Sequence, residues 1–285
     1  MKKRIIALFI LMAIALSFVS CEKPEPTDDF NFDEADDAAK IAYLEQRAEE
    51  KYDEEAKVEV AMHLTYYAGG VYYNNVTLDV NGTIVLRRLG PADVCTVMDL
   101  RTSVYNGQNR HDNEVGQISA YKDGYSYSAT YVPDDNGELT SIDDPVKERM
   151  DADEYLEDLS GDGADVPIDD LSLDSFKKVE IRRDDVGREW IVSCSVAKEE
   201  LLEQMSVWLA DMMSIDAESL EIASVYYDTF YGADDEDVYR IELTVRGKTV
   251  IGKQKLDVRF NFDATYSVPD ESDFKIPFES HYVEK

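Results

Sequence analysis

The segment KQKLDVRFNFDATY, residues 253–266, alternates between apolar and polar side chains. Leu256, Val258, Phe260 and Phe262 fall on one face, and the charged side chains fall on the other. A repeat of two residues is the period of a β-strand with one buried face. The segment therefore predicts a long strand in an antiparallel sheet that covers something on one side only.

The same period recurs along most of the chain, separated by turn signals. Asn81-Gly82 predicts a tight hairpin turn, and Lys122-Asp123-Gly124 predicts a second. Asp185-Val186-Gly187 predicts a turn between two later strands. Besides 253–266, the predicted strands are 58–67, 75–80, 83–89, 92–105, 115–121, 125–132, 176–184, 188–196, 220–230, 237–247 and 273–283.

Three segments have the period of a helix instead. Residues 36–52 place apolar side chains along one helical face, and Asp33 or Asp36 can cap the first turn. Residues 198–213 form a second amphipathic pattern. A short helix is predicted at 152–159, inside a polar interlude. This order of elements predicts an α+β domain with a large antiparallel sheet and helices on one side of it.

The N-terminal stretch MKKRIIALFILMAIALSFVSC has a positively charged start and an apolar run from Ile5 to Val19. This pattern is typical of a secretory signal peptide, and the run is short for a membrane span. The small residue Ser20 directly before Cys21 resembles a bacterial lipobox. Cys21 is therefore predicted to carry a diacylglyceryl group that anchors the protein to a membrane. The alternative is an ordinary signal peptide, or an anchor helix with an incidental cysteine.

These features divide the chain into three parts. Residues 1–20 are the predicted signal peptide, 21–35 an acidic tether that contains prolines, and 36–285 a single domain. The expected location is the outer face of a bacterial membrane, in the cell envelope.

The charge balance excludes one class of partner. The chain has 61 acidic and 29 basic residues, a formal net charge of −32. Binding to a nucleic acid backbone requires clustered Lys and Arg, so no nucleic acid partner is expected. An anionic membrane surface also repels the domain, which fits a protein held by a covalent anchor.

No motif in the chain points to catalysis. The three histidines, His63, His111 and His281, lack the spacing of a zinc site. G-x-S-x-G, P-loop and Rossmann motifs do not occur, so neither an enzyme activity nor a cofactor is expected. Cys95 and Cys194 either form a disulfide or stay as buried thiols.

Two features of the sequence are candidates for binding at the protein surface. The segment DLSGDGADVPID, from Asp158 to Asp169, spaces its oxygen ligands like a calcium loop, but Asp165 occupies a position that is normally apolar. A flexible acidic loop is the plainer interpretation, and no metal site is predicted. The 18 tyrosines could grip a sugar or a protein by stacking, although tyrosine is also an ordinary strand residue.

The order of elements resembles one known group of lipoproteins. The lipobox-like FVSC, the helix 36–52 leading into KVEVAMHLTYY, the tyrosine hairpin ISAYKDGYSYSATY and the final VRFNFDATYSVPDESDFKIP are similar to the LolA-like and LppX/LprG-like superfamily. The resemblance implies an unclosed half-barrel, a strongly curved antiparallel sheet with helices packed on its concave side. It also implies a lipid or other apolar molecule held in the hollow, and no catalytic residues.

The sequence thus predicts a lipid-anchored protein outside the cytoplasm that binds a lipid or other apolar ligand without catalysis. The alternative is an acidic surface module that adheres to a protein, glycan or calcium ion. No particular protein partner is indicated.

Overall fold

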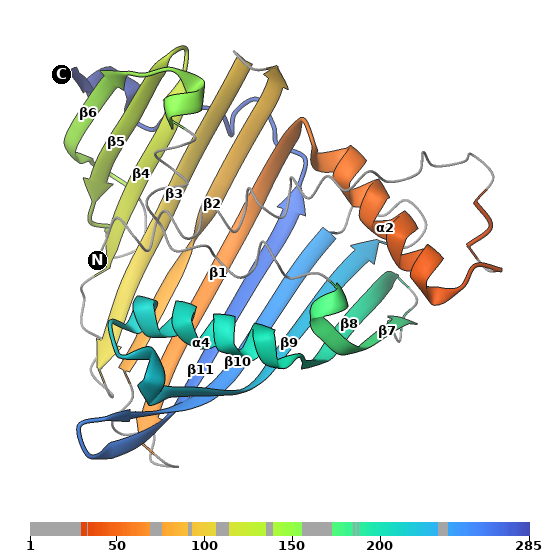
Figure 1. The fold of residues 1–285 in the computed structure, drawn as a ribbon. Helices are drawn as coiled ribbons and strands as arrows, with labels where there is room; N and C mark the ends of the chain where they lie inside the picture. Colours follow the sequence, from red (N-terminus) through yellow and green to blue (C-terminus); the bar gives the residue numbers. More distant parts are fainter. Residues whose placement is uncertain are drawn as a thin grey trace.

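The structure is a computed structural model built around one sheet (Figure 1). It describes residues 30–32, 34–68, 76–90, 93–106, 114–134, 139–155, 173–184, 186, 188–232 and 239–285. Within this part of the chain a 12-stranded sheet runs in the order β12-β6-β5-β4-β3-β2-β1-β11-β10-β9-β8-β7. The strands are β1 Glu55–Ala68, β2 Val76–Gly90, β3 Asp93–Asn106, β4 Val115–Lys122, β5 Tyr125–Tyr131, β6 Asp143–Arg149, β7 Phe176–Arg183, β8 Glu189–Ala197, β9 Leu220–Gly232, β10 Tyr239–Ile251, β11 Gln254–Ser267 and β12 Val283–Glu284.

The sheet consists of two meanders that meet in its centre. Strands β1 to β6 follow one another outward in one direction, and β7 to β11 return from the other edge until β11 pairs with β1. All pairs are antiparallel except β12 with β6, so the sheet is mixed at one edge. β7 and β12 are the two edges, and the sheet is not closed. The predicted α+β class with one large open sheet is confirmed.

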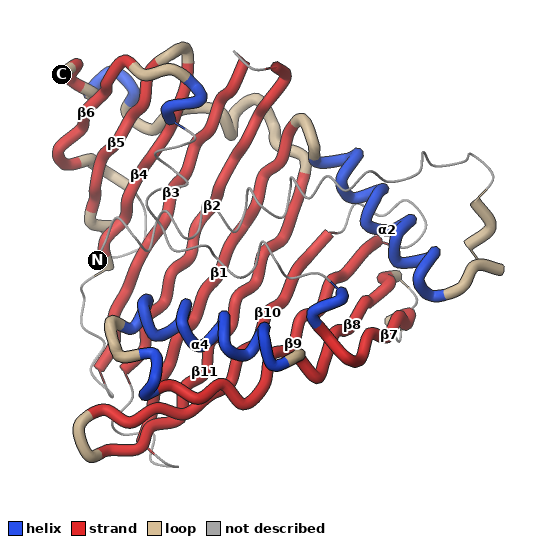
Figure 2. The backbone as a smooth tube through the Cα atoms, in the orientation of Figure 1, coloured by secondary structure: helices blue, strands red, loops and turns tan. Residues whose placement is uncertain are grey.

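Helices α2 (Asp37–Tyr52) and α4 (Glu199–Met213) lie on one face of this sheet (Figures 1 and 2). Asp36 caps α2, because its side chain accepts a hydrogen bond from the Ala39 amide at 2.9 Å. A short helical turn follows Asp151, whose side chain accepts from the Glu154 amide. Both long helices confirm the predicted positions within a residue or two.

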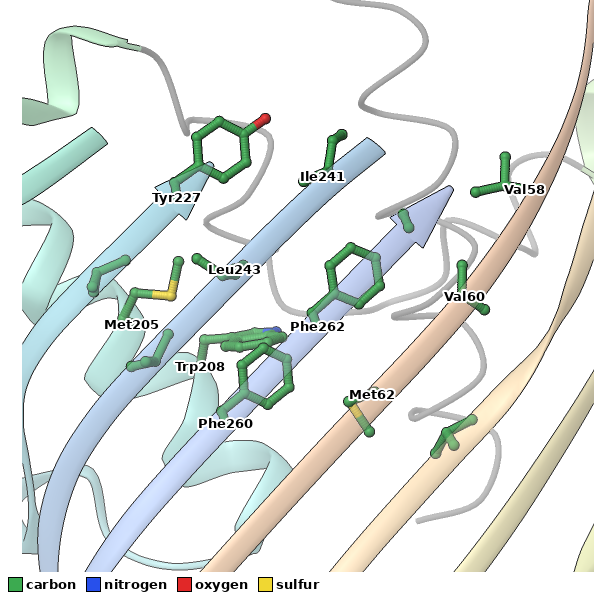
Figure 3. Packing of buried hydrophobic residues seen from close by; sticks show 14 of the residues in the cluster. Val58, Val60, Met62, Met205, Trp208, Tyr227, Ile241, Leu243, Phe260 and Phe262 are labelled. Atoms are coloured by element: carbon green, nitrogen blue, oxygen red, sulfur yellow. The ribbon is translucent and has the colours of Figure 1, made fainter. Parts of the chain in front are cut away.

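The face that carries α2 and α4 is called the helix face below. Its apolar core combines alternate residues of β1, β9, β10 and β11 with residues of α4 (Figure 3). Helix α2 adds Ile41, Leu44 and Tyr52 to this core. Met62, Phe260 and Phe262 are at most 2% exposed. All four residues of the predicted inward set, Leu256, Val258, Phe260 and Phe262, are buried, as the period of two indicated.

The opposite face, called the tail face, is crossed by the C-terminal residues 268–285. The apolar side chains of this segment pack on β3, β4 and β5, with Ile276 and Tyr282 in a second cluster beside Val97 and Tyr127. The ring planes of Tyr127 and Tyr282 meet edge to face at 5.3 Å. The predicted strand 273–283 is wrong, because these residues form turns over the tail face and only Val283 among them belongs to the two-residue β12.

The predicted turn at Asn81-Gly82 is also wrong. Both residues lie inside β2, which continues from Val76 to Gly90 and is paired on both sides. A Cβ at Gly82 would lie 2.1 Å from the Asp99 carbonyl oxygen of β3. The glycine thus serves a close approach of two strands and not a change of direction.

The second predicted turn is confirmed. Lys122 pairs with Tyr125, and the two loop residues Asp123 and Gly124 have φ of 53° and 78°. Positive φ at both positions is the geometry of a type I′ hairpin. In β8 the alternation of buried and exposed residues ends after Cys194, which is buried: Val196 has φ of 60° and is 56% exposed.

The predicted signal peptide and Cys21 lie outside the described residues. In the part of the chain that the structure covers, no helix has the length and hydropathy to cross a membrane. At the end of the predicted tether, Phe30 stacks on Tyr43 at 4.4 Å and Phe32 lies 4.7 Å from Trp190.

Candidate ligand-binding site

The centre of the helix face is a continuous row of apolar side chains from four neighbouring strands. Leu243 of β10 lies directly opposite Tyr227 of β9 and Phe262 of β11. Phe262 in turn lies opposite Met62 of β1. Alternation in each strand brings these side chains to the same face, and Figure 3 shows them side by side.

Further aromatic side chains lie on both sides of this row. We define the aromatic floor as these side chains together with the aromatic residues of the row; its members are Tyr52, Trp208, Tyr227, Tyr231, Tyr239, Phe260, Phe262 and Tyr266.

One end of the aromatic floor is a group of tyrosines beneath the C-terminal end of α2. The Tyr239 ring centroid lies 4.8 Å from that of Tyr266 and 5.4 Å from that of Tyr231. Tyr52, the last residue of α2, lies 5.7 Å from Tyr266 and 6.2 Å from Tyr239. Aromatic pairs at these separations add to the stability that burial supplies.

Burial keeps these phenols protonated. Desolvation raises the pKa of Tyr227, Tyr231 and Tyr266 well above the ordinary value of tyrosine. Desolvation also raises the pKa of Tyr239, and the α2 carboxylates Glu45 and Glu49 raise it further. The hydroxyls can therefore donate hydrogen bonds, and none of them becomes a nucleophile near neutral pH.

Trp208 of α4 lies at the other end of the aromatic floor. Its indole meets the Phe260 ring edge to face, with centroids 5.0 Å apart (Figure 3). Phe260 and Tyr266 are six residues apart in β11, a separation of about 20 Å along the strand. The two ends of the floor are thus joined by a long apolar track, with Phe262 and Ala264 between them.

Three polar atoms of the aromatic floor are buried without a partner. The Tyr52 hydroxyl, the Tyr266 hydroxyl and the Trp208 Nε1–H have no hydrogen-bond partner in the described structure. Buried polar groups in native proteins are normally satisfied, so each exception calls for an explanation. A bound molecule with acceptor groups would supply what these three donors lack.

The tail face carries a different, polar groove of about 450 Å³. Asn81, Thr83, Asp99 and Arg101 line it together with residues of β1 and β11. The buried Tyr131 fixes two of these side chains, because its hydroxyl donates to Asp99 and accepts from Arg101 Nε at 3.1 Å. This groove offers polar side chains to a ligand, beside a small apolar lining from Val60 and Ala61.

A larger hollow of about 1120 Å³ lies at the rim of the sheet, at one end of β2 to β5. Four basic side chains, Arg87, Lys122, Arg149 and Lys275, line it beside six carboxylates. Arg87 already has partners: it donates to Glu55 and Glu271 and lies 4.0 Å above the Phe274 ring. The lining of the hollow therefore has both signs of charge, with an excess of carboxylates.

The structure separates the two cysteines. Cys95 on β3 and Cys194 on β8 are both free thiols, with five strands between them. Burial raises the pKa of Cys194 to about 12, and it also raises the pKa of the Cys95 thiol. Of the two alternatives that the sequence left open, free thiols are therefore the one found.

Of the other candidate residues, some lie in the part of the chain that the structure describes and some lie outside it. His63 is on the tail face, bonded to Asp79 and within 2.7 Å of Thr65 Oγ1. Among the described residues no group of acidic, histidine or cysteine side chains could hold a metal ion. His111 and the segment from Asp158 to Asp169 lie outside the described residues.

The sequence does not mark Tyr52, Trp208 or Tyr266 as ligand contacts. It does indicate their apolar environment, because each falls on the apolar side of its helix or strand pattern. It does not indicate their missing partners, because a hydrogen bond depends on which groups the fold brings near.

Comparison with known proteins gives no family for this chain. No family model matches it, and no curated protein matches it. Among solved structures, the 12:0-ACP thioesterase from Umbellularia californica matches 73% of this chain and 75% of its own, with 14% identity and a TM-score of 0.16. A likeness with a TM-score this low carries no argument. The resemblance to LolA-like lipoproteins stays a prediction.

Proposed function

We propose that the protein is a lipid-anchored binding protein outside the cytoplasm, which holds a lipid or other apolar ligand on the aromatic floor without catalysis. In this proposal the sheet curves around the ligand as an unclosed half-barrel, with α2 and α4 on its concave side. The membrane is its partner through Cys21.

The observation that carries the proposal is the chemistry of the aromatic floor. Its track from Phe260 to Tyr266 is apolar, and burial of such surface is the main favourable term in binding an apolar molecule. Its three unpartnered donors lie on the same face as the track. Small-molecule sites typically have an apolar lining with a small number of precisely placed polar groups.

The direct test is to find the ligand. All described strands and helices lie within residues 30–285, so a chain that begins at residue 22 retains them. This chain is purified from a bacterial host without detergent, extracted with organic solvent and analysed by mass spectrometry. The proposal predicts a stoichiometric lipid or other apolar molecule. A folded protein with no such molecule, before and after incubation with total bacterial lipid, contradicts it.

The anchor has its own test. Cys21→Ala removes the only sulfur to which the predicted diacylglyceryl group can be attached at the lipobox. We expect fatty-acid labelling of the full chain to be lost and the protein to leave the membrane fraction. Ser20→Ala, which keeps a small residue before the cysteine, is the matched control and should be labelled normally. Labelling of the Cys21→Ala variant would contradict the anchor.

The polar groove on the tail face favours one alternative. An acidic surface module that adheres to a protein or glycan would use Asn81, Asp99 and Arg101, which Tyr131 holds in place. Under this alternative the aromatic floor is only a core, and Arg101→Ala abolishes binding to the partner while the extracted protein contains no lipid.

A further inference from the structure

We infer that Tyr52 and Tyr266 recognise an uncharged hydrogen-bond acceptor, such as an ester carbonyl, on an elongated ligand whose apolar chain runs along β11 toward Trp208. This inference rests on the proposed function and names the class of ligand.

Tyr52 and Tyr266 are neighbouring tyrosines with unpartnered hydroxyls. Tyr52 comes from the end of α2 and Tyr266 from β11, and their ring centroids are 5.7 Å apart. Both side chains are nearly inaccessible to solvent, and neither hydroxyl has a partner in the described structure. A buried hydroxyl without a partner costs free energy, and a ligand acceptor would remove that cost.

The surroundings select against a charged group. Burial raises the pKa of Tyr52, Tyr239 and Tyr266. The α2 carboxylates Glu45 and Glu49 add to this rise in pKa for Tyr239. An ionised carboxylate or phosphate placed here would lose its hydration, and the carboxylates beside Tyr239 would repel it. A neutral carbonyl accepts the same hydrogen bonds without either penalty.

The length of the track sets the length of the chain. From Tyr266 to Phe260 the strand covers about 20 Å. The hydrocarbon core of a bilayer is about 30 Å thick, so one lipid layer contributes about 15 Å, and a single acyl chain fits the track. Trp208 Nε1 at the far end is a third donor, and an oxygen near the end of the chain would satisfy it.

A pair of fluorescent probes tests the inference: cis-parinaric acid and its methyl ester, which share a chain and differ in charge. They are titrated into the delipidated chain from residue 22 onward, at a pH where the acid is ionised. We expect the ester to bind about tenfold more tightly than the acid. Tyr266→Phe should weaken the ester about fivefold to tenfold, the loss of one hydrogen bond.

The same variant gives a second readout that a merely structural tyrosine would not give. Because Tyr266→Phe deletes an unpartnered hydroxyl, the melting temperature of the ligand-free protein should rise, by about 2–4 °C. Tyr121→Phe is the control, since Tyr121 is a buried tyrosine outside the aromatic floor whose hydroxyl donates to the Met150 carbonyl oxygen at 3.2 Å; it should leave the affinity for the ester unchanged. If Tyr266→Phe fails to fold, Tyr52→Phe tests the same pair from α2.

The possible outcomes separate this inference from the proposed function. Equal affinity for acid and ester, or unchanged ester affinity in both Tyr266→Phe and Tyr52→Phe, overturns the inference and leaves the proposed function standing. If neither probe binds and no lipid is extracted, the proposed function fails and the inference fails with it.

Discussion

Tyr131 on the tail face and Tyr266 on the helix face are both at most 2% exposed, yet only one hydroxyl has partners. The Tyr131 hydroxyl donates to Asp99 and accepts from Arg101. The Tyr266 hydroxyl has no partner in the described structure, and neither does that of Tyr52 beside it. Both rings stabilise the fold through burial, so the difference lies in the polar end alone.

The comparison shows two uses of one residue type. On the tail face the phenol completes a local network that fixes the side chains of β3, and a satisfied buried network rigidifies the structure. On the helix face the phenols are donors that folding leaves unused. Proteins seldom bury such donors without a purpose, and three of them belong to the aromatic floor, whereas among the described residues the tail face has the single unpartnered hydroxyl of Tyr282. The aromatic floor is therefore the proposed site.

The largest effect is expected from Gly116→Ala. Gly116 lies opposite Tyr131, and a Cβ there would sit 2.0 Å from Cζ of the Tyr131 ring. The ring must move, which also breaks its bonds to Asp99 and Arg101, so we expect the free energy of unfolding to fall by about 3 kcal/mol.

Denaturant unfolding measures this loss. Gly90→Ala is the control, because a Cβ at Gly90 meets nothing within 4 Å. If Gly116→Ala costs no more than Gly90→Ala, the Tyr131 ring is not fixed in the way described.

The next effect comes from removing one hydroxyl on each face. Tyr131→Phe leaves Asp99 without its phenol donor and should lower the free energy of unfolding by about 1–2 kcal/mol. Tyr266→Phe removes an unpartnered group and should raise it, by up to about 1 kcal/mol. Each variant is the control of the other in thermal and denaturant unfolding. A similar fall in the free energy of unfolding of both variants would mean that the hydroxyl stabilises the fold equally on the two faces.

The smallest effect concerns the charges of the tail face. Asp228, Glu242 and Asp263 lie directly opposite one another on β9, β10 and β11, and like charges in such positions repel. Burial raises the pKa of Asp263 above its ordinary value of 3.8, although Arg240 lowers it. The folded state therefore holds this proton more tightly than the unfolded chain, and stability falls as pH rises through the raised pKa.

Asp263→Asn removes that cost. At neutral pH we expect a gain of about 0.5 kcal/mol, which disappears below pH 3.8, where the carboxyl is protonated in both states. Asp257→Asn on the same strand is the control, because Asp257 lies opposite Lys248 and should show no gain. A gain that does not depend on pH would contradict the electrostatic explanation.

The sequence predicts the elements of this fold better than their arrangement. Alternation marks β11 and its buried face, and the cap at Asp36 marks the start of α2. The pair Asn81-Gly82 predicts a turn that the structure does not contain. Val80 and Ile84, on either side of the pair, fall on the same face and indicate an uninterrupted strand. The pairing of β1 with β11 joins segments near opposite ends of the chain, and no local pattern specifies such a contact.

The site is less predictable than the fold for the same reason. That Trp208 and Tyr266 face the core follows from their periodicity. That their polar atoms lack partners follows only from the packing of α2, α4 and β11 together. The C-terminal residues 273–283 were misassigned because Phe274, Ile276 and Tyr282 are buried by covering the sheet and not by joining it.

The claim that an apolar ligand lies on the aromatic floor can be tested at Trp208 itself. The chain has two tryptophans, so Trp190→Phe leaves Trp208 as the only emitter. A bromine-labelled fatty-acid methyl ester, which quenches tryptophan on contact, is titrated into this variant. The account predicts quenching of Trp208 that saturates at a stoichiometric amount of ester. Emission that stays constant while the ester remains in solution with the folded protein would contradict it.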